Sequence, residues 1–486
     1  MNYSGVLFLL GRLLLVLAAA LIVPAAVSYS LEDGGIAAFL GSAAAAGAAG
    51  IALQRFFRQP SQFRFGKRDA YLLVAAAWVT ASIVGAAPYV AIRGAGFAVD
   101  GLFESASGFT TTGASILTDV ASIPRSLLLW RSLTHWLGGM GIIVLGIAIL
   151  PKLSIGGMEL LGAEAPGPIT EKLTPRIAQT AKALWGIYAG LTVIEALALI
   201  GLGMTPFDAI NHAFATMATG GFSTHPASVG GFASPAIEWV VTLFMLLAGA
   251  NFALHFHLVR GRPGPLWHDP EFRVFLGIIA GATLMLATDL VSGGGAESLL
   301  DALRTAAFQA ASVVTTTGFA TTDYDTWSSF SRALIVALMF VGGCAGSTGG
   351  SVKVVRIIIV VKRLVATVKQ QITPTAVLPV RVGRRAIPED VVGSVIAFVA
   401  MFMMLFAVGG LLLTLMGLDL VSAFTAAAAC LGNIGPGLGL VGPAQTYAPL
   451  PSAAKLLLVA GMIIGRLELY TVLVLFFLIG RIGLRR

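Results

Sequence analysis

The chain has 486 residues, of which 57% are hydrophobic and only 11% are charged, whereas a soluble domain carries about 25% charged residues. This composition excludes an ordinary soluble protein and predicts a polytopic membrane protein. The net charge of +8 does not indicate a protein that binds nucleic acid, because the basic residues gather between apolar runs.

Ten apolar runs are long enough to cross a bilayer, which takes about 20 residues of helix. They are expected near residues 5–28, 35–53, 69–93, 126–150, 181–204, 236–258, 272–292, 331–360, 390–417 and 453–480. The first run could be read as a signal peptide. It lacks a basic start and is longer than a typical signal core, so a retained helix is favoured.

Charge predicts the orientation of these runs. Lysine and arginine concentrate between the second and third runs, between the eighth and ninth, and after the tenth. Aspartate and glutamate concentrate in the alternate segments, at Asp100, Glu104, Asp208 and Asp419 among others. Basic loops remain in the cytoplasm, so both termini are predicted to be cytoplasmic. Topology and lipid contact explain most of the basic residues, and segment 362–385 is also long enough to dock a cytosolic partner.

A short polar string occurs twice, as FTTTGAS at Phe109–Ser115 and as VTTTGFA at Val314–Ala320, each time between two apolar runs. Two other outer segments align with these copies without a gap, and they end in ATGGFS and GNIGPG. The aligned glycines are Gly113, Gly221, Gly318 and Gly435. The pattern predicts four units of helix, short half-helix, glycine loop and helix, preceded by two extra helices.

Glycine loops of this kind have a physical use inside a membrane. Irregular backbone is tolerated there only where it is buried in protein or lines a watery cavity. Four such loops around one axis can form a ring of carbonyl oxygens that replaces the hydration shell of a cation. The half-helices would aim their negative C-terminal ends at the same axis. A duplicated lid or a packing turn is the alternative, but four aligned copies favour a pore.

A glycine-rich stretch, VGGCAGSTGGSVK, interrupts the eighth apolar run between Val341 and Lys353. It lacks the Gly-Lys-Ser/Thr ending of a phosphate-binding loop. The string GLGLVG at Gly437 matches a dinucleotide motif but follows no predicted strand, so it is rejected as well. A kink or a close helix crossing remains an alternative to a functional loop inside the membrane.

Arg466 lies deep in the last apolar run, where a charge is costly and suggests a function. Glu468 is only two residues further on and points to a different helix face, so a local ion pair is disfavoured. Glu195 remains a possible partner. Arg131 and His135 are expected to be packing or interface residues. The runs contain no nucleophile–base set, so an enzyme is not predicted.

Five strings together resemble one known family. They are WRSLTHWLGGMGIIVL from Trp130, NHAFATMATGGFST from Asn211, GGCAGSTGGSVKVVR from Gly342, ACLGNIGPGLG from Ala429 and GRLELYTVLVLF from Gly465. In this order, along nearly the whole chain, they are similar to the Trk/Ktr/HKT superfamily of potassium transporters. The resemblance is greatest to the membrane subunits of bacterial Trk potassium-uptake systems, the TrkH/TrkG type.

The resemblance implies which residues form a potassium selectivity filter. They are Thr111, Thr112, Gly113, Thr219, Gly220, Gly221, Thr316, Thr317, Gly318, Asn433, Ile434 and Gly435. In this superfamily a serine at the first filter glycine goes with sodium transport, so Gly113 favours potassium. The fourth loop departs from the threonine pattern, and an unequal ring is expected to discriminate less sharply between the two ions.

The resemblance also implies a gate. The gate loop comprises Gly342, Gly343, Gly346, Ser347, Thr348, Gly349 and Gly350, and Arg466 faces the pore below the filter. The implied partners are a second copy in a homodimer, membrane lipid, and a cytosolic nucleotide-binding regulatory subunit of TrkA type that responds to ATP/ADP or NAD. Potassium is the transported ion, and no organic cofactor is expected in this chain.

The expected fold is therefore an all-α polytopic membrane protein of the bacterial cytoplasmic membrane. Ten transmembrane helices would form four helix–pore-loop–helix repeats around one central pore, plus two extra N-terminal helices. The repeats are expected at 69–175, 176–270, 271–385 and 386–486, after an N-terminal segment at 1–68. A sodium-permeable transporter, or a proton- or sodium-coupled symporter of the same fold, is the alternative.

Overall fold

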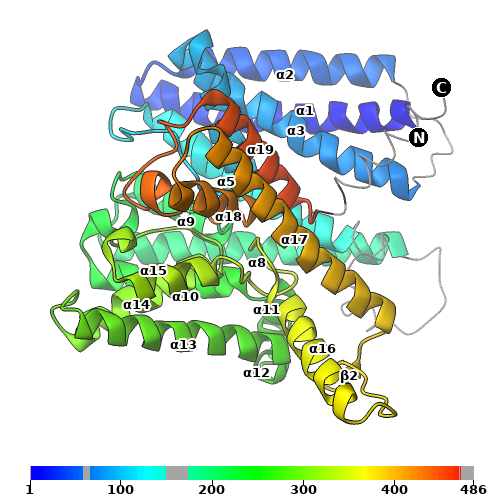
Figure 1. Cartoon of the computed structure of the whole chain (residues 1–486). Helices are drawn as coiled ribbons and strands as arrows, with labels where there is room; N and C mark the ends of the chain where they lie inside the picture. The colour runs from blue at the N-terminus through cyan, green and yellow to red at the C-terminus, as the bar shows by residue number, and fades with distance from the viewer. Residues whose placement is uncertain (1, 58–65, 149–172, 470, 472–486) are drawn as a thin grey trace.

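The computed structural model describes residues 2–57, 66–148, 173–469 and 471 of the chain (Figure 1). Regular structure in these residues is almost entirely helical. The strands found there are β1 (Arg381–Val382) and β2 (Arg385–Ala386), which pair as a small antiparallel hairpin. The described part of the chain therefore has the predicted helical character.

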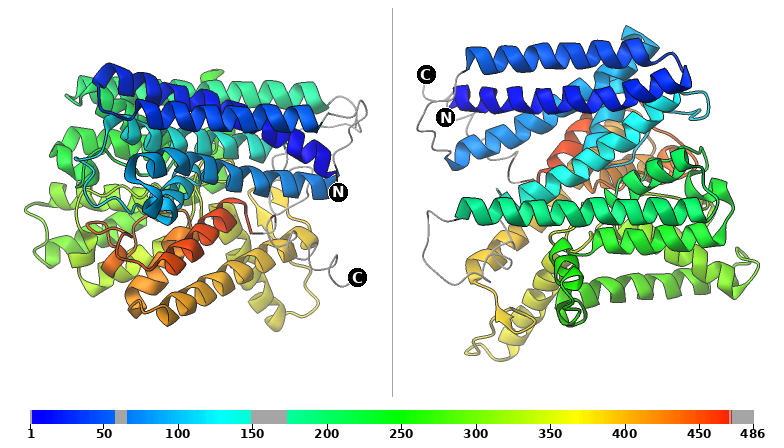
Figure 2. Two further views of the ribbon diagram at one scale, coloured as in Figure 1. Left: turned by 90° about the horizontal axis from the view of Figure 1, so that it is seen from above. Right: turned by 180° about the vertical axis from the view of Figure 1, so that it is seen from behind.

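Among the described residues, six helices are long and apolar enough to cross a membrane. They are α1 (Tyr3–Leu31), α2 (Ile36–Phe56), α3 (Lys67–Arg93), α8 (Leu173–Gly201), α13 (Pro270–Ser292) and α17 (Glu389–Leu415). Figures 1 and 2 show α1, α2, α8 and α13 running in nearly the same direction, with α3 and α17 tilted across them. Ile194 and Leu197 of α8 are 57% and 63% exposed, as expected for side chains that face lipid rather than water. These helices confirm six of the predicted apolar runs.

Four shorter helices precede the four glycine loops. They are α4 (Ala98–Phe109), α9 (Pro206–Met217), α14 (Leu299–Val314) and α18 (Leu420–Leu431). Short 3₁₀ turns adjoin several of these loops, at η1 (Ala95–Phe97), η2 (Ser228–Phe232), η3 (Tyr324–Thr326) and η4 (Gly439–Val441). The half-helix expected before each loop is therefore present.

The remaining helices follow the glycine loops. They are α5 (Arg125–Ala148), α10 (Pro235–Gly249), α11 (Phe252–Val259), α12 (Gly264–His268), α15 (Ser329–Leu338), α16 (Val354–Ile372) and α19 (Ser452–Arg466). The last part of the run predicted at 453–480 lies mostly outside the described residues, as does 149–150 of the fourth run.

One predicted span is wrong in shape. Residues 236–258 were expected to form a single helix, but the chain bends by 103° between α10 and α11. Ala250 adopts an extended conformation with φ −83° and ψ 160°, and the Asn251 side chain then starts the new helix by accepting from the Ala253 N–H. Gly249 and Asn251 are local signals of a break, since they suit a helix end and a helix start. The segment that binds at the bend lies far away in the chain.

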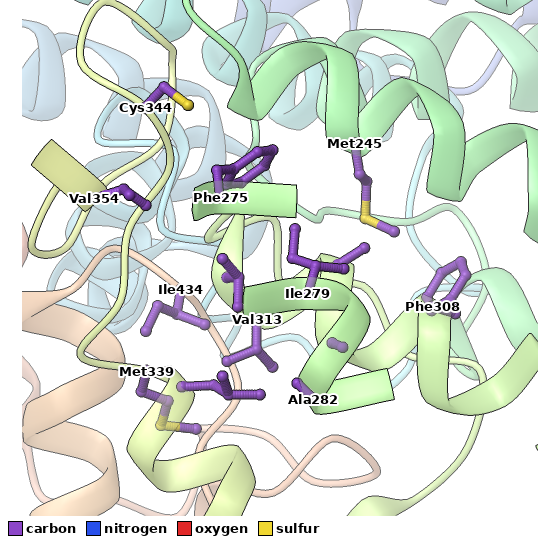
Figure 3. Packing of buried hydrophobic residues seen from close by; sticks show 14 of the residues in the cluster. Met245, Phe275, Ile279, Ala282, Phe308, Val313, Met339, Cys344, Val354 and Ile434 are labelled. Atoms are coloured by element: carbon purple, nitrogen blue, oxygen red, sulfur yellow. The ribbon is translucent and has the colours of Figure 1, made fainter. Parts of the chain in front are cut away.

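The interruption predicted in the eighth run is confirmed. Helix α15 ends at Leu338 and α16 begins at Val354, and the intervening residues are not helical. Two large hydrophobic clusters support these elements. One joins α10, α13 and α14 to both ends of this interruption, where Phe275, Cys344 and Val354 belong to the same packed region (Figure 3). The other joins α1, α3, α4 and α5 to α18 and α19.

Candidate functional site

The short helices α4, α9, α14 and α18 end in the same backbone arrangement, although their sequences differ. In the first, three successive N–H groups from Thr110 to Thr112 donate to carbonyls of the last turns at 2.9–3.0 Å. The equivalent three bonds recur at the other ends, from Ala218, Thr219 and Gly220, from Thr315, Thr316 and Thr317, and from Gly432, Asn433 and Ile434. The four aligned segments therefore share one local fold.

One residue in each loop adopts the left-handed conformation, which side chains rarely do. The φ angles are 52° at Thr111, 53° at Thr219, 59° at Thr316 and 54° at Asn433. The aligned glycine follows two residues later, with φ of 80° at Gly113, 78° at Gly221, 78° at Gly318 and 107° at Gly435. Such backbone strain costs about 1–3 kcal/mol per residue and persists only where the surroundings impose it. Its fourfold repetition marks the loops as the candidate site.

The four glycines lie against one another's loops. A Cβ atom added to Gly113 would lie 2.1 Å from Gly220 O, and one added to Gly221 would lie 2.0 Å from Thr317 O. A Cβ atom added to Gly318 would lie 1.9 Å from Ile434 O, and one added to Gly435 would lie 2.8 Å from Thr112 O. The contacts run from the first loop to the second, the second to the third, the third to the fourth, and the fourth back to the first. The loops therefore close a ring that only glycine permits.

The C-terminal ends of the four short helices meet at this ring. Three of the helices begin with a side-chain cap, from Thr205, Ser298 and Asp419. At Asp419, hydrogen bonds from the Ser422 side chain and backbone lower the pKa of the carboxyl group, so it stays ionised. A negative charge at the start of a helix reinforces its dipole, whose negative end then points to the ring. The site is electrostatically suited to a cation.

The fourth loop has contacts of its own. The Asn433 side-chain amide donates to Thr112 Oγ1 and to Met462 O, both at 2.9 Å, and so ties the fourth loop to the first. The Tyr447 hydroxyl donates to Gly435 O at 2.7 Å. The first and third loops instead contain hydroxyl pairs within one loop, Thr110 with Thr112 and Thr315 with Thr317, each at 2.8 Å. The ring is therefore closed but chemically unequal, as the sequence predicted.

A cavity of about 100 Å³ adjoins the ring, on the side of the residues that follow each glycine in the chain. Gly113, Gly221 and Gly318 line it, together with Pro436 of the fourth loop. In the described part of the chain no group of three His, Cys, Asp or Glu side chains is placed to hold a metal ion. The described residues that line the cavity include no Asp or Glu side chain, and Arg131 and His225 also line it.

A buried ion pair supports the first loop. Glu104 of α4 is fully buried and accepts from Arg131 Nε of α5 at 2.8 Å, from Ser115 Oγ at 3.0 Å and from Ile116 N at 2.9 Å. Arg131 also donates to Ser223 O of the second loop at 3.2 Å. Arg131 was predicted from the sequence to be a packing or interface residue. Its pairing with Glu104 was not predicted, because the two residues lie on different helices.

His135 links the same two loops from one helical turn further along α5. Its Nδ1 donates to Gly108 O at 2.8 Å, and its Nε2 accepts from the Phe222 N–H at 3.3 Å. One neutral tautomer satisfies both bonds. The spacing of Arg131 and His135 on one helix face was the available signal, and the structure shows that this face supports the ring.

Removing either member of the Glu104–Arg131 pair is expected to destabilise the protein strongly. Glu104→Gln or Arg131→Met leaves a buried charge without its partner, which costs about 3–5 kcal/mol. Thermal unfolding of the purified protein would show a large drop in Tm for each single variant, and a drop well below their sum for the double variant. Glu389→Gln breaks the exposed Arg363–Glu389 pair and serves as the control, for which no comparable drop is expected. Additive losses would contradict the pairing.

The non-helical segment between α15 and α16 lies directly beneath the ring. The Gly350 N–H donates to Thr316 Oγ1 at 2.7 Å, and Thr348 Oγ1 donates to Met217 O at 3.1 Å. A Cβ atom on Gly350 would lie 2.4 Å from Gly432 O. The segment therefore touches the ends of α9, α14 and α18 at once.

Arg466, at the end of α19, reaches this segment. Its Nη1 donates to Thr348 O at 2.7 Å, while Nε and Nη2 have no partner among the described residues. The two carboxylates considered from the sequence are placed elsewhere. Glu468 pairs with Arg356 at 2.5 Å, and both oxygens of Glu195 lack a hydrogen bond within the described part of the chain. The guanidinium is thus fully buried beside a backbone carbonyl.

Comparison with known proteins shows which family the chain resembles along its length. The family model described as TrkH, cation transport protein, matches residues 40–481. The chain is 41% identical over 482 residues to the Trk system potassium uptake protein TrkH of Salmonella typhimurium, a match that covers 98% of this chain and 99% of that protein. It is 40% identical over 480 residues to the TrkH protein of Vibrio parahaemolyticus, covering 98% of each.

A solved structure gives the same result. The crystal structure of the potassium transporter TrkH from Vibrio parahaemolyticus superimposes with a TM-score of 0.90 at 38% identity, and the match covers 98% of both chains. The matched proteins are transporters rather than enzymes, as predicted. The resemblance noted in the sequence is confirmed, and the chain belongs to the TrkH family of cation transport proteins.

Proposed function

We propose that the protein is the membrane subunit of a Trk system and carries potassium ions into a bacterial cell through the ring of four loops. The observation that carries the proposal is the closed ring itself, made by strained backbone at four helix C-termini. Relatives of nearly the same length at about 40% identity are named potassium uptake proteins. Carbonyl rings replace the hydration shell of potassium, and the helix dipoles favour its charge.

The filter residues on this proposal are those that form and line the ring. Thr111, Thr112, Thr219, Gly220, Thr316, Thr317, Asn433 and Ile434 supply carbonyls or side-chain oxygens around Gly113, Gly221, Gly318 and Gly435. Four repeats at 69–175, 176–270, 271–385 and 386–486 form ten transmembrane helices with the N-terminal pair. The basic segments face the cytoplasm of the inner membrane, and so do both termini.

The segment beneath the ring is the gate. Residues Gly342, Gly343, Gly346, Ser347, Thr348, Gly349 and Gly350 belong to the non-helical stretch that contacts the ends of three short helices. While it stays there, potassium cannot leave the ring toward the cytoplasm. Arg466 holds the Thr348 carbonyl and adds a positive charge that opposes leakage.

Partners would act on this gate from the cytoplasm. Helix α16 has exposed apolar side chains at Leu364, Val368 and Ile372, and basic side chains at Lys362 and Arg363. It projects from the body of the molecule toward the β1–β2 hairpin (Figure 1). This surface suits a second copy of the chain, lipid, and a TrkA-type regulatory subunit that binds ATP/ADP or NAD.

Cation uptake into proteoliposomes tests the proposal. The purified protein is reconstituted without a pH gradient at a clamped voltage, and potassium, rubidium and sodium fluxes are compared with and without the regulatory subunit. Potassium and rubidium entering well ahead of sodium would support a potassium filter. Equal sodium entry would favour a sodium-permeable transporter, and uptake that requires a proton or sodium gradient would favour coupled symport.

Potassium is also expected to stabilise the folded protein more than sodium does. An ion that binds only the native ring stabilises it by about 2.7 kcal/mol at a hundred times its Kd, by mass action. Replacing sodium with potassium at constant ionic strength should therefore raise Tm, and removing potassium should lower it. Identical Tm values in the two salts over a wide concentration range would contradict selective binding.

A further inference from the structure

The carboxylate of Glu271 binds both the gate segment and the start of the helix that follows it. Glu271 lies in the first turn of α13, and its Oε1 accepts from the Ala345 N–H at 2.8 Å and from the Val355 N–H at 3.0 Å. Ala345 lies in the first half of the gate segment, and Val355 lies in the first turn of α16 that follows it. One side chain thus joins the gate segment to the first turn of α16.

These two contacts are buried. Glu271 is only 8% exposed, so both hydrogen bonds are shielded from water. A buried N–H group that loses its acceptor costs about 1–3 kcal/mol. The Val355 N–H belongs to the first turn of a helix and has no intrahelical partner, and Ala345 lies in irregular backbone. Glu271 therefore supplies acceptors that the gate segment does not supply for itself.

The bend in the sixth span holds the neighbours of Ala345. The Cys344 N–H donates to Gly249 O at 2.8 Å, and the Phe252 N–H donates to Gly346 O at 3.2 Å. The Gly249 carbonyl and the Phe252 N–H have no partner within a helix, because α10 ends before α11 begins. The 103° bend therefore provides a binding site for the gate segment. Cys344 lies in the same packed region as Phe275, which is one turn beyond Glu271 on α13 (Figure 3).

The carbonyl groups of the gate segment are held differently. Lys353 Nζ donates to Gly349 O at 2.5 Å, and Arg466 Nη1 donates to Thr348 O at 2.7 Å. Cationic side chains therefore bind carbonyls of Thr348 and Gly349, and Glu271 binds N–H groups that come before and after them in the chain. Release of the loop toward the cytoplasm requires the Glu271 bonds to break.

We propose that Glu271 is a positioning residue that holds the gate segment beneath the ring through its bonds to Ala345 and Val355, which together are called the clasp. Opening of the gate begins with the loss of these two bonds. This inference rests on the gate function proposed above. Glu271 lies three residues after His268, the last residue of α12, and Trp267 of that helix is 61% exposed. A partner that moves α12 would therefore move the clasp.

Cys344 provides a direct readout of the clasp. Its side chain is only 1% exposed, and it lies next to Ala345 in the chain. In a Cys430→Ala background, labelling by N-ethylmaleimide is followed by mass spectrometry, and potassium flux is measured on the same reconstituted protein. Glu271→Leu is expected to raise the labelling rate about tenfold or more, because two buried hydrogen bonds are lost and both N–H groups are left without an acceptor. Flux is expected to rise with it.

Two further variants distinguish a positioning role of Glu271 from a general loss of stability. Glu271→Gln keeps an oxygen that can accept both bonds, so its labelling should stay close to that of the parent. Glu238→Leu removes an equally buried glutamate, also 8% exposed, from the first turn of α10, where it pairs with Arg304 and not with the gate segment. It should not expose Cys344. If Glu271→Leu does not fold, Glu271→Asp replaces it, because the shorter side chain cannot reach both N–H groups.

The outcomes separate the clasp from the gate. Faster Cys344 labelling together with higher flux supports both. Faster labelling with unchanged flux supports the clasp but shows that the segment is not the gate. Unchanged labelling in a folded Glu271→Leu or Glu271→Asp variant, or equal exposure of Cys344 in Glu238→Leu, overturns the proposal.

Discussion

Replacing Gly113 with serine is expected to lower the ratio of potassium to sodium flux by about tenfold or more, a change of at least about 1.4 kcal/mol. The glycine has φ of +80°, and a Cβ atom there would lie 2.1 Å from the carbonyl oxygen of Gly220. That oxygen belongs to the second loop, so it must move away. A displaced carbonyl no longer replaces the hydration shell of potassium well, so the preference for potassium over sodium falls.

The control is Gly277→Ser on α13. Gly277 is exposed, has no positive φ, and an added Cβ would meet no atom within 4 Å. Both variants are purified and reconstituted at equal amounts, and fluxes of potassium and sodium are measured under one voltage. A Gly113→Ser protein that folds and keeps the parent's flux ratio would refute the assignment of this glycine to a filter.

Replacing Arg466 with methionine is expected to raise potassium flux through the membrane subunit alone. Its guanidinium is 3% exposed and donates to Thr348 O, so its removal frees the gate segment and takes a positive charge away from the path. A rise of about tenfold corresponds to a barrier lowered by roughly 1.4 kcal/mol. Flux into proteoliposomes without the regulatory subunit measures this effect.

Arg466→Lys is the matched variant. It keeps the charge, although it offers fewer donors in a different geometry. If the charge is what opposes leakage, the lysine variant stays close to the parent while the methionine variant leaks. If both variants merely lose stability, with lower Tm and no increase in flux, Arg466 is a structural residue and the proposed role is wrong.

The repeated architecture of the site could be predicted from the sequence, because it depends on local patterns. The strings around Gly113 and Gly318 are nearly identical, and apolar runs flank every copy. The half-helices before the loops follow from the same alignment. The break in the eighth run was also visible, since its many glycines do not suit a continuous helix.

The contacts between distant segments could not be predicted in this way. The bend at Ala250 has local signals in Gly249 and Asn251, but the gate segment that binds there lies far away in the chain. Glu104 was visible as an acidic residue of an outer segment, and its pairing with Arg131 depends on how α4 packs against α5. Glu271 stood at the edge of a predicted span without any local signal of its two loop contacts.

The central claim is that the four loops coordinate a potassium ion within their ring. The most direct test is anomalous diffraction from crystals grown in rubidium or thallium, two ions that replace potassium. An anomalous peak is expected on the axis of the ring, among the carbonyls that precede Gly113, Gly221, Gly318 and Gly435. Peaks found only outside the ring, in crystals where the four loops keep this arrangement, would contradict it.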